Sequence, residues 1–183
     1  MKHAKQEIKK AVQQTGEFIG NTYGKSFSEL TGKSVQNCSS VKDILGFTDE
    51  SAEGIYGQAY LLYNTGRYRD AGEIFRLLVM LNATEPKYLI GLAACYHMLK
   101  EYQSAGSTYN LASIIDPDNP VPFFHASDCY LHLGDKATAA SMLEMAVKRA
   151  TNKPHFATLK QRAEITLDTL KKEITQTVNN TRS

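Results

Sequence analysis

The chain has 183 residues, of which 42% are hydrophobic, and its formal net charge is +2. This length suits one domain with a buried core, and so small a charge gives no broad basic surface for nucleic acid. No stretch approaches the roughly 18 apolar residues of a membrane span, and the N-terminus lacks the apolar core of a signal peptide. We therefore expect a soluble cytoplasmic protein that does not insert into membranes.

The first 48 residues are predicted to lead into the main domain. Apolar residues at helical spacing predict an amphipathic helix over residues 4–19. Glycine, asparagine, serine and threonine are frequent over residues 20–39, which predicts a flexible connection. A capping-box pattern then predicts a short helix over residues 40–46, after which Thr48 or Asp49 can cap the next helix.

Three alanines with a constant spacing dominate the rest of the chain. Ala71, Ala105 and Ala139 are 34 residues apart, which is the period of the tetratricopeptide repeat. In this repeat two antiparallel helices approach closely where a side chain is small. Aromatic, small and turn residues recur at matching offsets in all three copies, most clearly in the copy that begins at Pro86. The sequence therefore predicts an all-α fold with three tandem repeats, an α-solenoid.

A C-terminal helix is expected to cap this solenoid. The third repeat is predicted to end near Ala150, Asn152 is expected to cap the following helix, and Pro154 suits its first turn. Apolar residues at helical spacing then continue toward residue 176. The predicted organisation is a lead-in over 1–48, a three-repeat domain with its capping helix over 49–176, and a polar tail over 177–183.

The sequence offers little support for catalysis, a metal or a cofactor. Cys38, Cys95 and Cys129 are an odd number of cysteines, and the last two occupy equivalent places in successive repeats, which favours buried reduced thiols. His125, Cys129 and His132 come from one segment, but zinc requires three or four converging ligands and His132 is expected to point elsewhere. No acid, base and nucleophile converge in the pattern, so we predict no catalytic, metal or cofactor site.

Binding is expected in the concave groove that the first helices of the repeats line. The repeat phasing places twelve residues on this groove, among them Glu53, Lys87 and Val121. The other nine are the candidate binding residues: Tyr56, Tyr60, Tyr63, Ile90, Ala94, His97, Phe124, Asp128 and Leu131. Most of these side chains are aromatic or apolar, and no basic pair is present to grip a terminal carboxylate. An extended segment with apolar anchors would fit such a surface. Alternatively, the three tyrosines pack on the N-terminal helix, and both hold if that helix covers part of the groove.

Several segments around these positions resemble the class II chaperones of type III secretion. They are SVKDILGF, RYRDAGEIFRLLVMLN, YLIGLAACYHMLKEY and PFFHASDCYLHLGD. The resemblance implies a bacterial, cytosolic and ATP-independent chaperone, linked to virulence, that keeps hydrophobic translocator proteins from aggregating before export. It also implies that the client places an extended N-terminal segment with proline and leucine anchors in the groove. Tyr56, Tyr60, Tyr63 and Phe124 match the aromatic residues with which this family contacts its peptides.

Other partners and functions stay open at this level. Similar proteins often form homodimers through the N-terminal helix, and the resemblance leaves a contact with the export machinery and a regulatory role in secretion open. The alternative function is a general repeat adaptor or scaffold, which would use the same groove on a soluble folded partner. The nature of the partner discriminates these hypotheses, because only a chaperone should keep a membrane-active protein soluble.

Overall fold

Antiparallel helix pairs follow one another along the chain in a computed structural model, which describes residues 46–180. The pairs are α4 (Asp49–Asn64) with α5 (Tyr68–Leu81), α6 (Pro86–Met98) with α7 (Tyr102–Ile115), and α8 (Pro120–His132) with α9 (Lys136–Ala150). A 3₁₀ turn η1 (Pro154–Phe156) and the long helix α10 (Ala157–Asn180) complete the described part. The predicted all-α fold with three helix pairs is confirmed, and the elements predicted over residues 4–45 lie outside the described residues.

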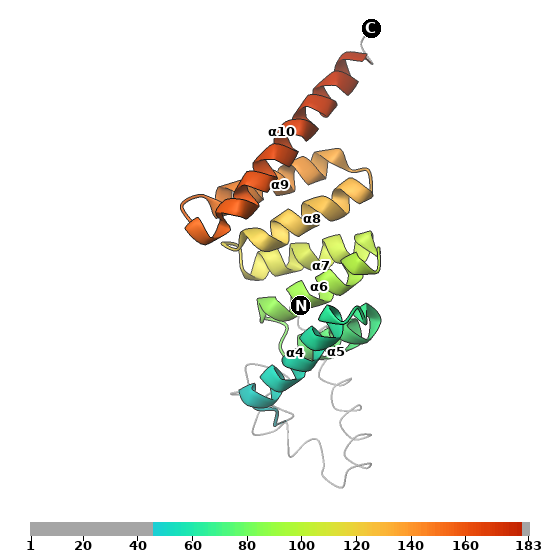
Figure 1. Ribbon diagram of the computed structural model, residues 1–183, viewed down its shortest axis with the longest axis vertical. Coiled ribbons are helices and arrows are strands. Elements are labelled where there is room, and N and C mark those ends of the chain that lie inside the picture. The colour runs from blue at the N-terminus through green and yellow to red at the C-terminus, as the bar shows by residue number, and fades with distance from the viewer. Residues whose placement is uncertain (1–45, 181–183) are drawn as a thin grey trace, which may run out of the picture. The chain divides into compact units, whose positions relative to one another are not determined.

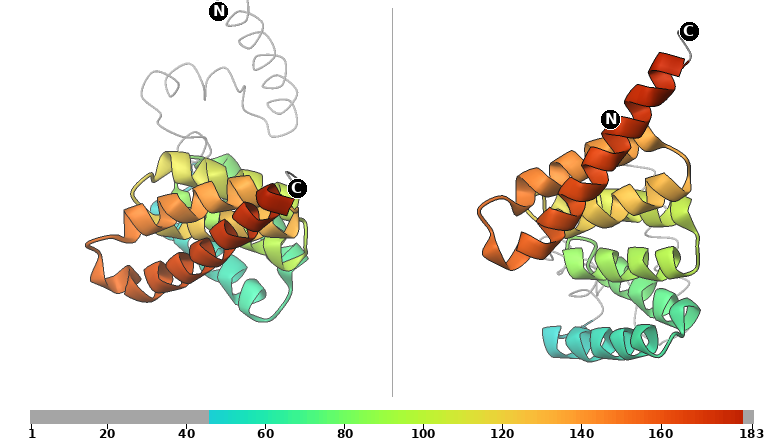
Figure 2. Two further views of the ribbon diagram at one scale, coloured as in Figure 1. Left: turned by 90° about the horizontal axis from the view of Figure 1, so that it is seen from above. Right: turned by 45° about the horizontal axis from the view of Figure 1, so that its top comes forward.

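The helix pairs stack so that each helix packs chiefly on its predecessor and its successor. Residues from Ala52 onward form one compact unit, and Figures 1 and 2 show its helices laid in succession toward α10. The core runs through the unit in three clusters, centred on Phe75, Tyr109 and Leu143. Among the helices of residues 46–180, none is both long enough and apolar enough to cross a bilayer.

Side chains and prolines at the helix starts explain where the elements begin. The hydroxyl of Thr48 accepts a hydrogen bond from the Ser51 amide at 3.1 Å, as expected for a cap of α4. Pro86 and Pro120 occupy the first turns of α6 and α8, where their missing N–H has no intrahelical partner to lose. The side chain of Asp135 accepts from the Thr138 amide at 3.0 Å and caps α9.

The small residues that define the repeat period are fully buried. Ala71, Ala105 and Ala139 each have 0% of their surface exposed. Ala59 and Ala93, from the first helices of their repeats, are equally buried and belong to the same clusters as Ala71 and Ala105. The pair of helices in each repeat can therefore approach at these points without a side chain to separate them.

The turn inside each repeat uses one backbone conformation. Gly66, Lys100 and Gly134 occupy equivalent positions and have positive φ angles of 81°, 63° and 78°. In each turn the next amide donates to the carbonyl five residues earlier, which closes the end of the first helix. Glycine adopts this conformation without steric cost, whereas Lys100 adopts it with its Cβ close to the backbone.

The segment between α9 and α10 differs from the predicted cap. Asn152 has a φ of 64°, a left-handed conformation that follows the end of α9, and Lys153 immediately precedes the 3₁₀ turn. The prediction that Asn152 caps the last helix was therefore wrong, because asparagine also tolerates the left-handed conformation that ends a helix. Helix α10 buries Ala163, Leu167 and Leu170 in the last cluster and so covers the third repeat.

Replacing Ala105 by leucine should destabilise the protein by about 1–3 kcal/mol or more, because the buried site has no space for the extra atoms. Urea denaturation followed by circular dichroism measures this loss. Ser107→Leu, at an exposed position of the same helix, is the matched control and should change the unfolding free energy little. An equal decrease in the free energy of unfolding in the two variants would contradict the close approach of the helices at Ala105.

Exchanging residues at the turns should change stability in opposite directions. Lys100→Gly should raise the free energy of unfolding by up to about 1 kcal/mol, because glycine relieves the left-handed backbone strain. Gly134→Ala should lower it by a similar amount at the equivalent turn. Thermal and urea unfolding of the two variants would measure both effects, and a stabilising Gly134→Ala would refute this interpretation.

Candidate binding face on the first helices of the repeats

The nine candidate binding residues come from α4, α6 and α8, the first helices of the three repeats. We call their exposed surface the A-helix face, defined by Tyr56, Tyr60, Tyr63, Ile90, Ala94, His97, Phe124, Asp128 and Leu131. Tyr60 is 54% exposed, and the other eight residues are partly exposed. None of the nine is fully buried, so each retains some surface that a ligand could contact.

Two of the three tyrosines of α4 form one aromatic surface. Tyr56 and Tyr60 stack with their ring centroids 6.4 Å apart. The ring of Tyr56 also packs against those of Phe75 and Tyr88, each 5.9 Å away between centroids, whereas the ring of Tyr60 is exposed to solvent. Tyr63 packs edge-on against Tyr68 of α5 at 5.3 Å. Tyr60 is thus the most accessible of the three tyrosines.

A charged pair borders this aromatic surface. Lys87 of α6 forms an ion pair with Glu53 of α4, its equivalent 34 residues earlier, and the hydrogen bond between them raises the pKa of Lys87. The ammonium group also lies 5.1 Å from the centre of the Tyr56 ring. Because Lys87 already has these partners, it is poorly placed to grip a free carboxylate.

A cleft of about 320 Å³ opens near the other end of the A-helix face. Its lining includes four predicted residues, His97, Phe124, Asp128 and Leu131, together with His125, Ser127, Leu143, Arg162 and Thr166. The guanidinium of Arg162 lies 5.4 Å from the centre of the Phe124 ring. The lining of the cleft includes both apolar and polar side chains, and its volume falls in the range of small binding sites.

Arg162 and Thr166 were not predicted as site residues. They belong to α10, which follows the last repeat and has no equivalent within the 34-residue period. Repeat phasing therefore carries no information about which side of this helix meets the cleft. The amphipathic pattern predicted the helix itself, but not the contribution of its side chains to the site.

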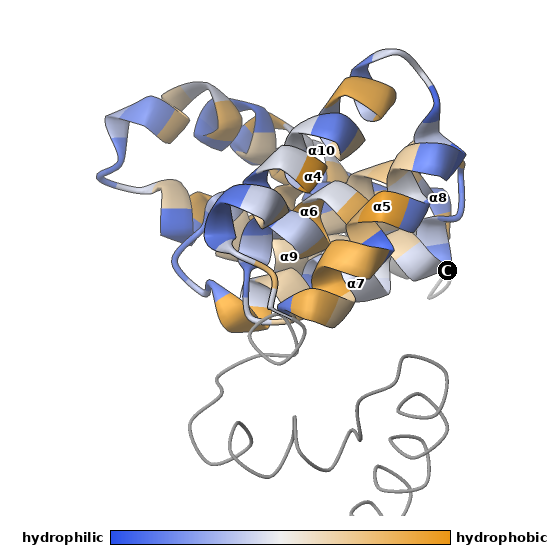
Figure 3. Cartoon of the chain, turned by 90° about the horizontal axis from the view of Figure 1, so that it is seen from below, coloured by the Kyte–Doolittle hydropathy of each residue, from blue (hydrophilic) through white to orange (hydrophobic). Residues whose placement is uncertain are grey.

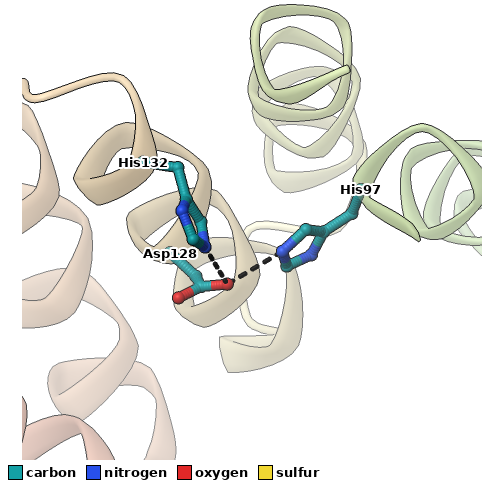
Figure 4. Close-up of side chains that lie close together, drawn as sticks. All are labelled: His97, Asp128 and His132. Atoms are coloured by element: carbon teal, nitrogen blue, oxygen red, sulfur yellow. Dashed lines mark ion pairs between the residues drawn. The ribbon is translucent and has the colours of Figure 1, made fainter. Parts of the chain in front are cut away.

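Two histidines and one carboxylate meet on this face. Nε2 of His97 lies 2.8 Å from Oδ2 of Asp128, and Nε2 of His132 lies 3.9 Å from the same oxygen (Figure 4). Only His97 and Asp128 were predicted on the groove. His132, which was not predicted on the groove, also stacks on Tyr102 of α7, with the ring centroids 4.1 Å apart. Ile90 packs against the middle core cluster, and Ala94, four residues later on α6, is half-buried.

The two described cysteines have the character expected of core residues. Cys95 and Cys129 are free and fully buried. Burial raises the pKa of both thiols to about 12, so they stay protonated near neutral pH. A protonated buried thiol is a poor nucleophile and a poor metal ligand.

Exposed hydrophobic residues also occur on the second helices of the repeats. Figure 3 shows hydrophobic segments on α5 and α7, where Leu77, Met80, Leu111 and Ile114 are exposed. Ile114, at 74%, is even more exposed than Tyr60. Exposure alone therefore does not select the A-helix face; the stacked tyrosines and the cleft distinguish it.

Comparison with known proteins places these features in context. Residues 52–83 and 86–119 match the family model for the tetratricopeptide repeat. Chaperone protein SicA of Salmonella dublin is 27% identical over 155 residues, which cover 85% of this chain and 92% of SicA. Low calcium response locus protein H of Yersinia pseudotuberculosis is 32% identical over 124 residues, which cover 68% of this chain and 74% of that protein.

A solved structure with the same fold contains a bound peptide. It is the Yersinia enterocolitica type III secretion chaperone SycD in complex with a peptide of the translocator YopD. The TM-score is 0.67 at 31% sequence identity, and the match covers 69% of this chain and 96% of SycD.

The free energy of unfolding should fall as the pH drops below about 6.5, because burial lowers the pKa of His125 below its unfolded value. His97 and Arg162 lower this pKa further, and Asp128 opposes them. The unfolded state then binds more protons than the folded state, so acid favours unfolding. His125→Gln should flatten this pH dependence in urea titrations between pH 5 and 8. His155→Gln, at an exposed site, should not; an unchanged slope in His125→Gln would contradict the assignment.

Proposed function

This chain belongs to the family of type III secretion chaperones that includes SycD and low calcium response locus protein H, and we propose that its A-helix face binds an extended segment of a translocator protein. The observation that carries the proposal is that one face has both an accessible aromatic surface, at Tyr56 and Tyr60, and a cleft lined by Phe124 and Leu131. The likeness to SycD in complex with a peptide of the translocator YopD supports it.

The two ends of the A-helix face suit different parts of such a segment. At the tyrosine end, each ring offers a flat apolar surface for a proline or leucine side chain, and the hydroxyl can hydrogen-bond to a peptide backbone. At the other end, a cleft of about 320 Å³ has room for a leucine-sized anchor. An extended segment that reaches both ends would cross the A helices of all three repeats.

The expected affinity is moderate. Each buried leucine-sized anchor contributes roughly 1.5–3 kcal/mol, and ordering the segment offsets part of this gain. Two or three anchors then give about micromolar affinity. Such binding is reversible, so the client can be released for export without ATP hydrolysis.

In this proposal, binding alone keeps the translocator from aggregating before export. A translocator has apolar stretches that cannot be buried in the cytosol, and exposed apolar surface drives self-association. A chaperone that binds the unassembled client shifts the equilibrium away from aggregation by mass action. No chemical step is required, which agrees with a non-enzymatic role for a family of chaperones.

Replacing Tyr60 by alanine should weaken binding of the translocator segment at least about tenfold, because an exposed aromatic anchor is lost. Isothermal titration with the N-terminal segment of the translocator from the same bacterium measures this change. The unfolding temperature should change little, since Tyr60 is 54% exposed. Light scattering of the full-length translocator should show that the unmodified chain suppresses aggregation more strongly than the variant.

Two control variants locate the binding face. Leu61→Ala removes a neighbouring side chain that is 56% exposed, and Ile114→Ala removes the exposed residue of α7; both should leave affinity unchanged. Loss of binding only in Ile114→Ala would move the client to the second helices. If the chain recovers only soluble folded proteins from the cytosol and leaves translocator aggregation unchanged, the adaptor function replaces the chaperone function.

A further inference from the structure

We propose that His97, Asp128 and His132 form a binding site for a divalent transition-metal ion of the zinc class. Their three ligand atoms, two imidazole nitrogens and one carboxylate oxygen, all lie within 4.8 Å of one another. Both imidazoles point toward the same carboxylate oxygen of Asp128, His97 from α6 and His132 from α8, which also carries Asp128 (Figure 4). The inference rests on this geometry and holds whether or not the A-helix face binds a translocator.

The two distances from the carboxylate oxygen to the imidazole nitrogens lie on either side of the value for a tetrahedral zinc site, and the third separation is at most 4.8 Å. Zinc binds nitrogen and oxygen at roughly 2.0–2.2 Å, so two tetrahedral ligands lie about 3.4 Å apart. The Oδ2 atom of Asp128 is 2.8 Å from Nε2 of His97 and 3.9 Å from Nε2 of His132. One of these distances is slightly short and the other slightly long, so an ion would bind after side-chain rotations that also bring the two imidazole nitrogens, now within 4.8 Å, to the same spacing.

The helices supply these ligands by simple periodicity. Asp128 and His132 are four residues apart on α8, the spacing that places two metal ligands on one face of a helix. His97 lies in the last turn of α6, the first helix of the preceding repeat. Its side chain is 20% exposed, whereas those of Asp128 and His132 are 48% exposed, so an ion could enter from solvent.

Tyr102 orients both imidazoles. Its ring is stacked on His132 with an interplanar angle of 8°, and it meets His97 edge-on at 5.7 Å between centroids. A ring held on one face loses less rotational freedom when its nitrogen binds a metal. The two histidines are therefore partly preorganised for binding at Nε2.

The donor set selects the class of ion. Two neutral imidazoles and one carboxylate suit zinc and neighbouring transition metals, whereas calcium and magnesium prefer oxygen ligands. Three protein ligands leave a fourth position for water or for a side chain from another molecule. The charge of Asp128 offsets part of the charge of the ion. Two of the ligands, His97 and Asp128, also line the cleft to which Arg162 contributes, whereas His132 does not.

Titration of the chelator-treated full-length chain, prepared without a histidine tag, tests the site directly. Zinc is measured by competition with a chromophoric chelator, and cobalt by the visible absorption of its tetrahedral complexes. We expect one ion per chain, and an affinity at least about tenfold lower in His132→Asn and in the isosteric Asp128→Asn. Circular dichroism should show that both variants remain folded.

Matched controls and a spectroscopic signature decide the result. His155→Asn and Asp118→Asn change an exposed histidine and an exposed carboxylate elsewhere and should bind the ion as the unmodified chain does. Equal affinity in all four variants would overturn the proposal. So would a near-ultraviolet thiolate-to-cobalt absorption, because it would assign the metal to cysteine. Loss of one bound ion in the two site variants alone would establish the site.

Discussion

The close approach of two helices at small buried residues is the constraint on which the rest of the structure depends. Ala59 and Ala71 in the first repeat, and Ala93 and Ala105 in the second, have no exposed surface. With no bulky side chain between the helices, each pair packs at one spacing and the next pair stacks on it in the same way. This regularity brings equivalent residues of successive first helices within reach of one another, as the ion pair between Glu53 and Lys87 shows.

The face that results is chemically uneven. One end presents stacked tyrosines and the other a cleft with histidine, carboxylate and guanidinium groups. These differences arise because every repeat needs small residues at the same packing positions, whereas its groove positions can carry different side chains. Packing thus determines where the residues of the A-helix face lie, and their side chains determine which ligands they can contact.

The sequence predicted those parts of the structure that the repeat controls. Period and residue type were enough for the helix pairs and the buried alanines, and they narrowed the cap of α4 to Thr48 or Asp49, of which Thr48 accepts the hydrogen bond. The cluster at Asp128 was missed because its histidines occupy non-equivalent positions: His97 belongs to one repeat and His132 to the next. Arg162 was missed because α10 lies outside the period. The left-handed Asn152 was misassigned because asparagine suits both a helix start and a helix end.

The succession of helices also affects how the protein would unfold. Each helix packs chiefly on its immediate neighbours, so interactions between residues distant in the sequence are few and an end of the stack can open while the middle stays folded. A ligand that lies across α4, α6 and α8 would contact helices that lack extensive contact with one another. Binding of such a ligand would make helices that otherwise open separately unfold as one cooperative unit. Backbone amide hydrogens would then exchange more slowly even in parts of these helices that the ligand does not contact.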